Sequence, residues 1–99
     1  MANFSITEYS DIALDRTGIP MAVGLEPAIN IQSVSFTATP GISSEFNKST
    51  RLVRVIADAD CRIKFGTSPT AGSGSTLLNA EVAEYFGVGA QLKVSVIEA

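Results

Sequence analysis

Apolar and polar residues alternate in several short segments of the chain, and a period of two is typical of strands that bury one face. Val, Ile, Phe and Thr are frequent in these segments, as expected for a pleated, half-buried surface. Short strands at roughly 8 to 12 residue spacing predict an all-β fold, either a small antiparallel β-sandwich or a jelly-roll-like barrel. The expected strands cover residues 29–38, 51–57, 61–65, 77–78, 82–86 and 92–96.

Details of the pattern predict how these strands are connected. The alternation slips between Ile31 and Val34, which suggests a bulge in the first strand near Gln32 and Ser33, because one extra residue exchanges the two faces. The turn at 58–60 is short enough for the strands on either side to pair antiparallel. Residues 79–85 would also tolerate a helical turn, but the regular spacing favours strand. The polar residues 67–76 predict a loop with an exposed, mobile tip.

The first 26 residues look different from the rest. They are polar and weakly patterned, and Gly18, Pro20 and Gly24 interrupt regular structure. Residues 11–16 could form one helical turn, and the apolar residues before them either a short strand or a docking segment. We therefore expect two parts: an extended N-terminal arm at 1–26 and a β-sandwich domain at 27–99.

Length and charge limit the possible functions. The 99 residues can support one hydrophobic core. Ten acidic and seven basic residues give a net charge of −3, so we expect no nucleic-acid partner. The nearest approach to a basic cluster is more typical of a solvated sheet face. The chain has no apolar stretch of about 18 residues and no signal-peptide pattern after Met1, so we expect no membrane partner. The residues that come nearest to a basic cluster are Arg51, Arg54, Arg62 and Lys64.

Candidate chemistry is scarce. The chain has no histidine, which removes most hydrolytic triads and the commonest general base, and we expect a protein that is not an enzyme. Cys61, the single cysteine, stands at an apolar position of an alternating strand and is expected to be a buried thiol. Asp58 and Asp60 open like a calcium loop but lack the later ligands, and they fit a turn better. Glycines at 72–74 and 87–89 lack the rest of a phosphate-binding motif. The sequence thus indicates no catalytic, cofactor-binding or metal-binding residue.

Beyond these patterns, parts of the sequence resemble small structural proteins of tailed bacteriophages. The resemblance extends from residue 6 almost to the end of the chain. It is carried by ITEY at 6–9, Glu26-Pro27, RVIADADCRIKFGTSPTA at 54–71, EYFGV at 84–88 and KVSVI at 93–97. It implies a structural role in the virion and has no catalytic motif attached to it.

The resemblance leads to a specific hypothesis. It implies a capsid cement or decoration protein that stabilises the head by binding the major capsid protein. We expect a homotrimer on the capsid surface of the virion, assembled in the cytoplasm of the host bacterium. Such a protein needs contact surface rather than chemistry or a cofactor, and an arm laid over a neighbour would provide it. The residues expected to bind partners are Phe4, Ile6, Tyr9 and Tyr85.

Two other virion roles remain open. A neck or tail connector would form rings of six or twelve copies. A head-fibre or receptor-binding accessory protein would use the 67–76 loop together with Tyr85 as its contact surface. The loop contains no aromatic residue to stack on a sugar, which makes the receptor-binding role less favoured than the cement role.

Overall fold

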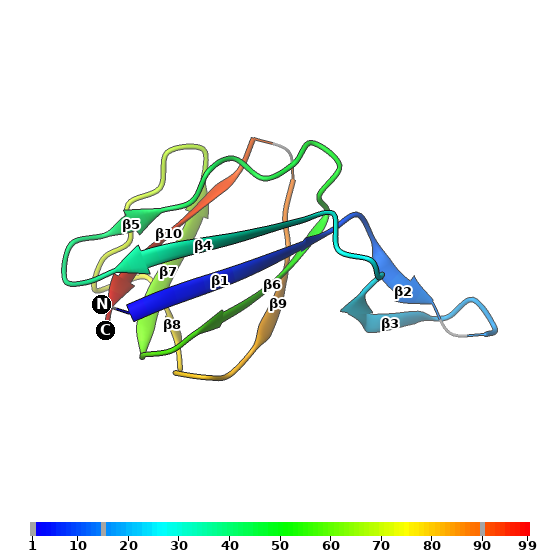
Figure 1. Ribbon diagram of the computed structural model, residues 1–99, viewed down its shortest axis with the longest axis horizontal. Helices are drawn as coiled ribbons and strands as arrows, with labels where there is room; N and C mark the ends of the chain where they lie inside the picture. The colour runs from blue at the N-terminus through cyan, green and yellow to red at the C-terminus, as the bar shows by residue number, and fades with distance from the viewer. Residues whose placement is uncertain (1, 15, 90) are drawn as a thin grey trace.

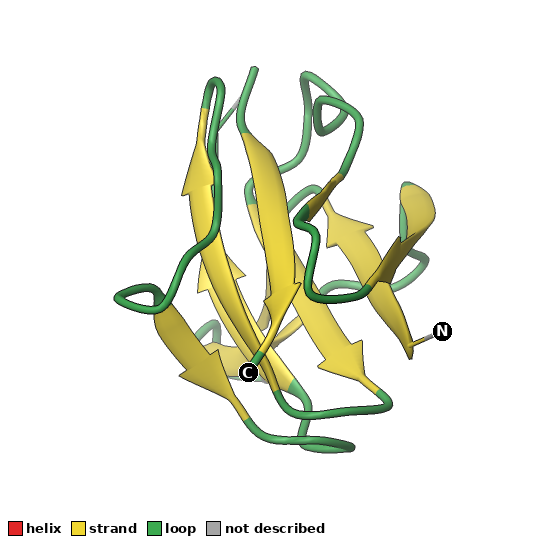
Figure 2. Cartoon of the chain, turned by 90° about the vertical axis from the view of Figure 1, so that its left-hand side faces the viewer, coloured by secondary structure: helices red, strands yellow, loops and turns green. Residues whose placement is uncertain are grey.

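The computed structural model describes residues 2–14, 16–89 and 91–99, and these residues form strands and loops without any helix (Figure 2). The all-β fold expected from the sequence is therefore confirmed. In chain order the strands are β1 (Ala2–Tyr9), β2 (Ile12–Leu14), β3 (Pro20–Gly24), β4 (Asn30–Phe36), β5 (Gly41–Ile42), β6 (Leu52–Ala57), β7 (Cys61–Gly66), β8 (Thr76–Leu78), β9 (Glu84–Gly87) and β10 (Lys93–Glu98).

The strands form two four-stranded sheets and one separate hairpin, as Figure 1 shows. We call the sheet with strand order β4-β1-β6-β9 the first sheet and the sheet with order β5-β10-β7-β8 the second sheet. All pairings are antiparallel among the described residues. The two sheets pack face to face around one core, and this arrangement is a small β-sandwich. The β2-β3 hairpin projects from one end.

The core is built from the inward-facing side chains of both sheets. Successive side chains of a strand point to opposite faces, so alternate apolar residues fill the space between the sheets. Two aromatic residues, Phe36 and Phe46, are also buried there. The buried side chains of the central strands are Phe4, Ile6, Val53, Val55, Ala57, Cys61, Ile63, Val94 and Val96, each no more than 2% exposed. The expected buried thiol of Cys61 is thus confirmed.

The structure corrects the expected arm at 1–26. Residues 2–9 form β1, which lies between β4 and β6 and pairs with both along its length. The reason is the alternation of β1 itself: Phe4 and Ile6 point into the core, and the polar residues between them point outward. Residues 12–14 form a strand instead of the expected helical turn. Only the segment that follows β1 projects from the sandwich.

The expected pairing of β6 with β7 is also wrong, because the turn at 58–60 crosses from the first sheet to the second. Both strands bury alternate side chains, and they do so from opposite sides of the core. The carboxylates of the turn fix this crossing by accepting hydrogen bonds from distant segments. The amide of Asn3 donates to Asp58 Oδ1 (2.8 Å) and the amide of Ala80 donates to Asp60 Oδ1 (2.8 Å). These aspartates therefore stabilise a turn, as expected, but through long-range partners.

The expected bulge in β4 is absent from the structure. The register of β1 with β4 runs without a shift from the Ala2–Phe36 pair to the Glu8–Asn30 pair. Ile31 points outward and is 71% exposed, while the polar Gln32 points inward, where its amide bonds to the carboxylate of Glu8 (2.9 Å). The hydrophobic pattern changes phase here because the inward position is occupied by polar Gln32, whose partner Glu8 is buried, while the apolar Ile31 faces outward.

Candidate partner-binding surface

The β2-β3 hairpin is an excursion that the sandwich does not need. Strands β1 and β4 pair antiparallel up to Glu8 and Asn30, so a turn of two to five residues could connect them. Instead, residues 10–14 and 16–29 leave the sheet, form the hairpin and return (Figure 1). Most connections between strands in compact domains have about 4 to 6 residues, so the 20 residues between Tyr9 and Asn30 make an unusually long one. The hairpin is therefore our first candidate for a functional element.

Tyr9 anchors the base of the hairpin. Its ring lies directly beneath Gly24, where a Cβ atom would overlap the ring, so this position requires glycine. The Tyr9 hydroxyl donates to Glu26 Oε2 (2.9 Å). Burial, and then the hydrogen bond to the Glu26 carboxylate, raise the pKa of Tyr9 above its usual value. The Tyr9 phenol therefore stays protonated, and keeps donating to Glu26, up to a higher pH than an ordinary tyrosine.

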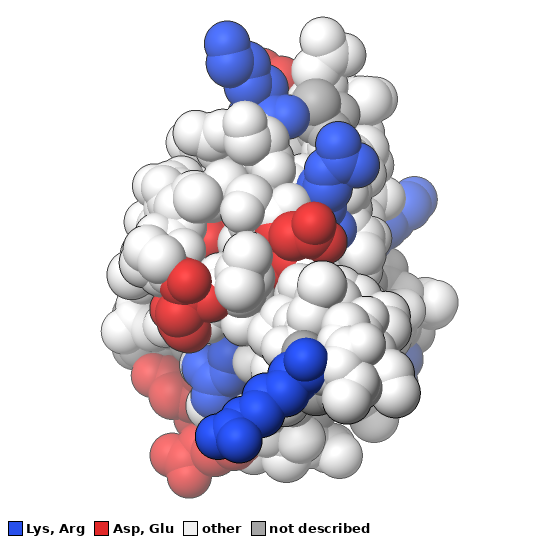
Figure 3. Space-filling view, turned by 90° about the vertical axis from the view of Figure 1, so that its right-hand side faces the viewer, with Lys and Arg blue, Asp and Glu red and all other residues white. Residues whose placement is uncertain are grey.

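One face of β3 exposes an apolar stripe. From Ile19 to Leu25 every second residue is a large apolar one. We call Met21, Val23 and Leu25 the hairpin stripe; they are 45%, 39% and 45% exposed. The sequence from Thr17 to Leu25 contains no charged residue, and Figure 3, which views this end of the molecule, shows wide uncharged surface between separate charged groups. Exposed apolar patches of this kind mark interaction sites on soluble proteins.

The structure separates the four residues expected to bind partners. Phe4 and Ile6 are fully buried in the core of their own chain, so they offer no surface to a partner. Tyr9 is 4% exposed, because the base of its own hairpin covers it at Gly24. Tyr85 is half-buried on the outer face of the first sheet, where its ring centroid lies 6.4 Å from that of Tyr9. Of the four, only Tyr85 retains an accessible side chain beside the hairpin.

Sequence reasoning missed the hairpin stripe although its signal was present. The apolar alternation from Ile19 to Leu25 is the pattern of a strand with one covered face. The residues between the apolar ones include Pro20 and Gly24, two residue types that favour a loop over a regular strand. In the structure they are the small residues of the opposite face, and Gly24 is needed for contact with Tyr9.

A second missed residue is Glu8, a fully buried carboxylate. It accepts four hydrogen bonds: from the side chains of Asn30 (2.7 Å), Gln32 (2.9 Å) and Thr50 (2.7 Å), and from the backbone amide of Asn47 (2.8 Å). Burial alone would raise its pKa, but these hydrogen bonds outweigh burial and lower it. A carboxylate engaged in this way is a poor base. Its role is to join β1, β4 and the 47–50 segment. The sequence signal for its burial was its position: Glu8 continues the alternation of Phe4 and Ile6 and therefore lies on the same inward face.

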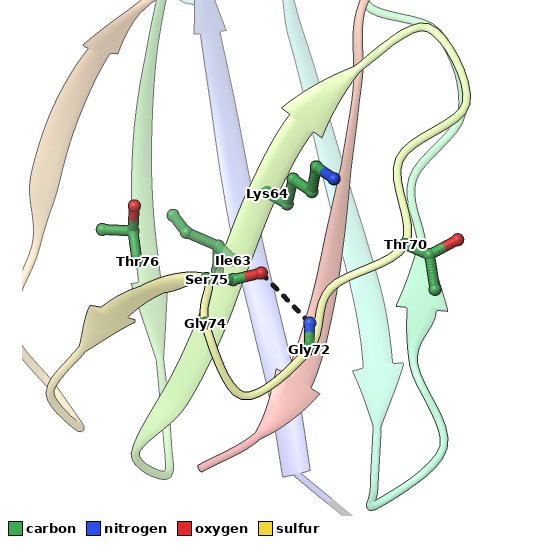
Figure 4. A pocket seen from close by; sticks show the side chains of 7 residues that line it. All are labelled: Ile63, Lys64, Thr70, Gly72, Gly74, Ser75 and Thr76. Atoms are coloured by element: carbon green, nitrogen blue, oxygen red, sulfur yellow. Dashed lines mark hydrogen bonds between the residues drawn. The ribbon is translucent and has the colours of Figure 1, made fainter.

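The 67–76 loop and Tyr85 do not form one contact surface. The loop folds over the outer face of the second sheet, where the Ala71 amide donates to Ser95 Oγ (2.9 Å), whereas Tyr85 lies on the first sheet. The loop and β7 border an open hollow of about 450 Å³ (Figure 4). The Gly72 amide donates to Ser75 Oγ across the turn of the loop (3.0 Å). The side chains around the hollow are Ile63, Lys64, Thr70, Ser75 and Thr76, which include no acid–base pair.

The basic residues likewise do not gather. Arg54 extends from the first sheet and Arg62 and Lys64 from the second, so they belong to different faces of the sandwich. Arg62 donates to the backbone oxygen of Ser75 (2.9 Å), which ties down the 67–76 loop. This arrangement lacks the clustered positive surface that phosphate backbones require.

Groups for metal or thiol chemistry do not come together either. Among residues 2–14, 16–89 and 91–99, no three Cys, Asp or Glu side chains are placed to hold a metal ion. Burial and, to a lesser degree, the charge of Asp60 raise the pKa of the Cys61 thiol to about 11, which leaves it unreactive at neutral pH.

The described part of the chain also contains no helix able to span a membrane. In comparisons with protein-family models, curated proteins and solved structures, nothing matched this chain.

Proposed function

We propose that this chain is a cement or decoration protein of a tailed-phage capsid, which stabilises the head by binding the major capsid protein as a homotrimer. The observation that carries the proposal is the β2-β3 hairpin with its exposed apolar stripe, Met21, Val23 and Leu25. The sandwich closes its core without this hairpin, and exposed apolar patches mark interaction sites on soluble proteins, so we assign the hairpin to contact with other subunits.

The rest of the molecule supports an assembly role over chemistry. Its buried carboxylate, Glu8, is saturated with hydrogen-bond donors, and its thiol, Cys61, is buried. A virion subunit needs a rigid body and adhesive surface, and the sandwich with its projecting hairpin has both. The sequence resemblance to small structural proteins of tailed phages points to the same class.

The test is binding to emptied heads of the phage that encodes the chain. Purified protein is added to heads from which DNA and accessory proteins have been removed, and the bound copies per head are counted by quantitative gel analysis. A cement protein should bind in hundreds of copies and raise the temperature at which the heads break. Binding of six or twelve copies would replace this proposal with a connector, and no binding would overturn it.

A further inference from the structure

We propose that the hydrogen bond between Tyr9 and Glu26 sets the direction in which the hairpin projects, and that these two side chains are positioning residues for the contact with the capsid. The inference rests on the proposed function, because it treats the hairpin as the contact element. It goes further by naming the side chains that orient the hairpin stripe. We call Tyr9 and Glu26 the positioning pair.

The direction of the hairpin is decided at its base. The hairpin stands away from both sheets in Figure 1, and Leu14 and Met21 on its strands are 58% and 45% exposed. At Gly18 a Cβ atom would meet nothing within 4 Å. About 20 Å of extended chain separates Gly24 from Gly18, so a rotation of about 20° at the base would move the tip by about 7 Å. A small change at the base therefore displaces the stripe by more than the width of a side chain.

Tyr9 meets the base of the hairpin at two points. Its ring packs beneath Gly24, the last residue of β3, and its hydroxyl donates to Glu26 Oε2 (2.9 Å). The ring contact alone would let the hairpin pivot, whereas two separate contacts define a direction. Tyr9 itself is held by the sandwich, since it pairs with β6 and its backbone oxygen accepts from the amide of Arg51 (2.9 Å). The positioning pair thus fixes the hairpin relative to the centre of the first sheet.

The carboxylate of Glu26 is oriented for this bond by its own segment. Its other oxygen, Oε1, accepts from the backbone amide of Ala28 (3.2 Å), on the stretch that returns to β4. Glu26 is exposed, so water competes for its carboxylate and the net contribution of the bond to folding is modest. Packing beneath Gly24 needs only an aromatic ring, which phenylalanine would also supply. The hydroxyl of Tyr9 is therefore better explained by orientation than by stability.

Orientation matters for binding because a loose contact element must be ordered when its partner arrives. The free energy of that ordering is subtracted from the affinity, and an element that is already fixed avoids the loss. The stripe, Met21, Val23 and Leu25, lies on a ribbon that would otherwise sample many directions. The positioning pair orders it before the capsid is met.

Distances between spin labels test the positioning step in the free protein. Labels are placed on Arg16→Cys, beside the hairpin tip, and on Leu77→Cys, which is 48% exposed on the second sheet; native Cys61 is fully buried and should stay unlabelled. The intact pair should give one narrow distance distribution. Tyr9→Phe and Glu26→Ala should each broaden it, and the double variant should broaden it no further, because both changes remove the same bond.

Two control variants separate orientation from general damage. Tyr85→Phe removes the same hydroxyl from the neighbouring ring, whose centroid lies 6.4 Å from that of Tyr9, and should leave the distribution narrow. Glu26→Gln keeps an acceptor oxygen for the Tyr9 hydroxyl and should also stay narrow. The urea midpoint should be nearly equal in all these variants. A distribution that is equally narrow in Tyr9→Phe and wild type, or broad in wild type, would overturn the inference.

Binding to emptied heads tests the consequence. Tyr9→Phe and Glu26→Ala should bind about tenfold more weakly than wild type, the effect of losing one hydrogen bond to a charged acceptor. The number of copies at saturation should not change. Unchanged affinity despite a broadened distribution would overturn the inference and keep the proposed function. Wild type that binds no heads would remove the proposed function together with the binding part of the inference, and the label distances alone would then decide whether the pair orients the hairpin.

Discussion

Two strands of this protein carry the same alternating pattern and end in opposite environments. In β1, Phe4 and Ile6 take alternate positions and are fully buried. In β3, Met21 and Val23 do the same and are 45% and 39% exposed. The difference shows that alternation predicts a strand with one apolar face and leaves open which surface covers that face. For β1 the cover is the opposite sheet; for β3 we have proposed that it is another subunit of the assembly.

The positions of the two strands in the fold explain the difference. β1 lies in the middle of the first sheet, between β4 and β6, and faces the second sheet. Within the described residues β3 pairs only with β2, and two-stranded hairpins are marginally stable alone in water. It is held in place by its base, where Gly24 sits against Tyr9. Its stripe therefore contributes little to folding of the isolated chain.

The sharpest test of this contrast replaces one large apolar residue in each strand by alanine. Phe4→Ala should lower the free energy of unfolding by about 3–5 kcal/mol, because it removes a fully buried ring and leaves a cavity. Met21→Ala should change it by less than about 0.5 kcal/mol at concentrations where the chain is monomeric. Urea unfolding followed by circular dichroism measures both. Similar losses in the two variants would mean that the stripe is already covered within one chain.

The comparison also shows which features the sequence could predict. The all-β fold and the strands after residue 28, except the two-residue β5, follow from local alternation, and the buried position of Cys61 follows for the same reason. The role of β1 was missed because its fourth inward position is Glu8, a polar residue that only its distant donors make compatible with a core. The crossing at 58–60 was missed because a short turn favours pairing unless long-range hydrogen bonds dictate otherwise. Local sequence does not contain such partners.

A second substitution, with a smaller expected loss of stability, tests Glu8, the polar residue at the end of the inward face of β1. Glu8→Gln keeps the size of the side chain but replaces one acceptor oxygen by a donor, which leaves buried donors among Asn47, Thr50 and their neighbours without a partner. We expect a loss of about 2–3 kcal/mol in the free energy of unfolding at neutral pH. Amide hydrogen exchange at Asn47 should accelerate as well. An unchanged stability would mean that water replaces the missing acceptor.

The pH dependence of this loss has a definite sign. The pKa of Glu8 in the folded chain is lower than its unfolded value, which is about 4.3. Its stabilising contribution is therefore complete above that unfolded value and is lost as the pH falls through the folded pKa. Wild type should lose stability over this acidic range more steeply than Glu8→Gln, so the two curves should converge. Parallel curves from pH 6 down to pH 2 would contradict the lowered pKa.

The smallest expected effect concerns the base of the hairpin. Gly24→Ala places a methyl group against the Tyr9 ring and should cost about 1–2 kcal/mol, whereas Gly74→Ala, with no atom within 4 Å of the new carbon, should cost little. Because the chain has two tyrosines and no tryptophan, titration of phenol absorbance can follow Tyr9. Its raised pKa should fall toward about 10 in Gly24→Ala as the ring leaves Glu26, and stay raised in Gly74→Ala. If Gly24→Ala kept the raised pKa, the hairpin would have yielded and Tyr9 would remain in place. The stripe would then be movable, and the contact that we propose between the hairpin and other subunits would have no fixed geometry.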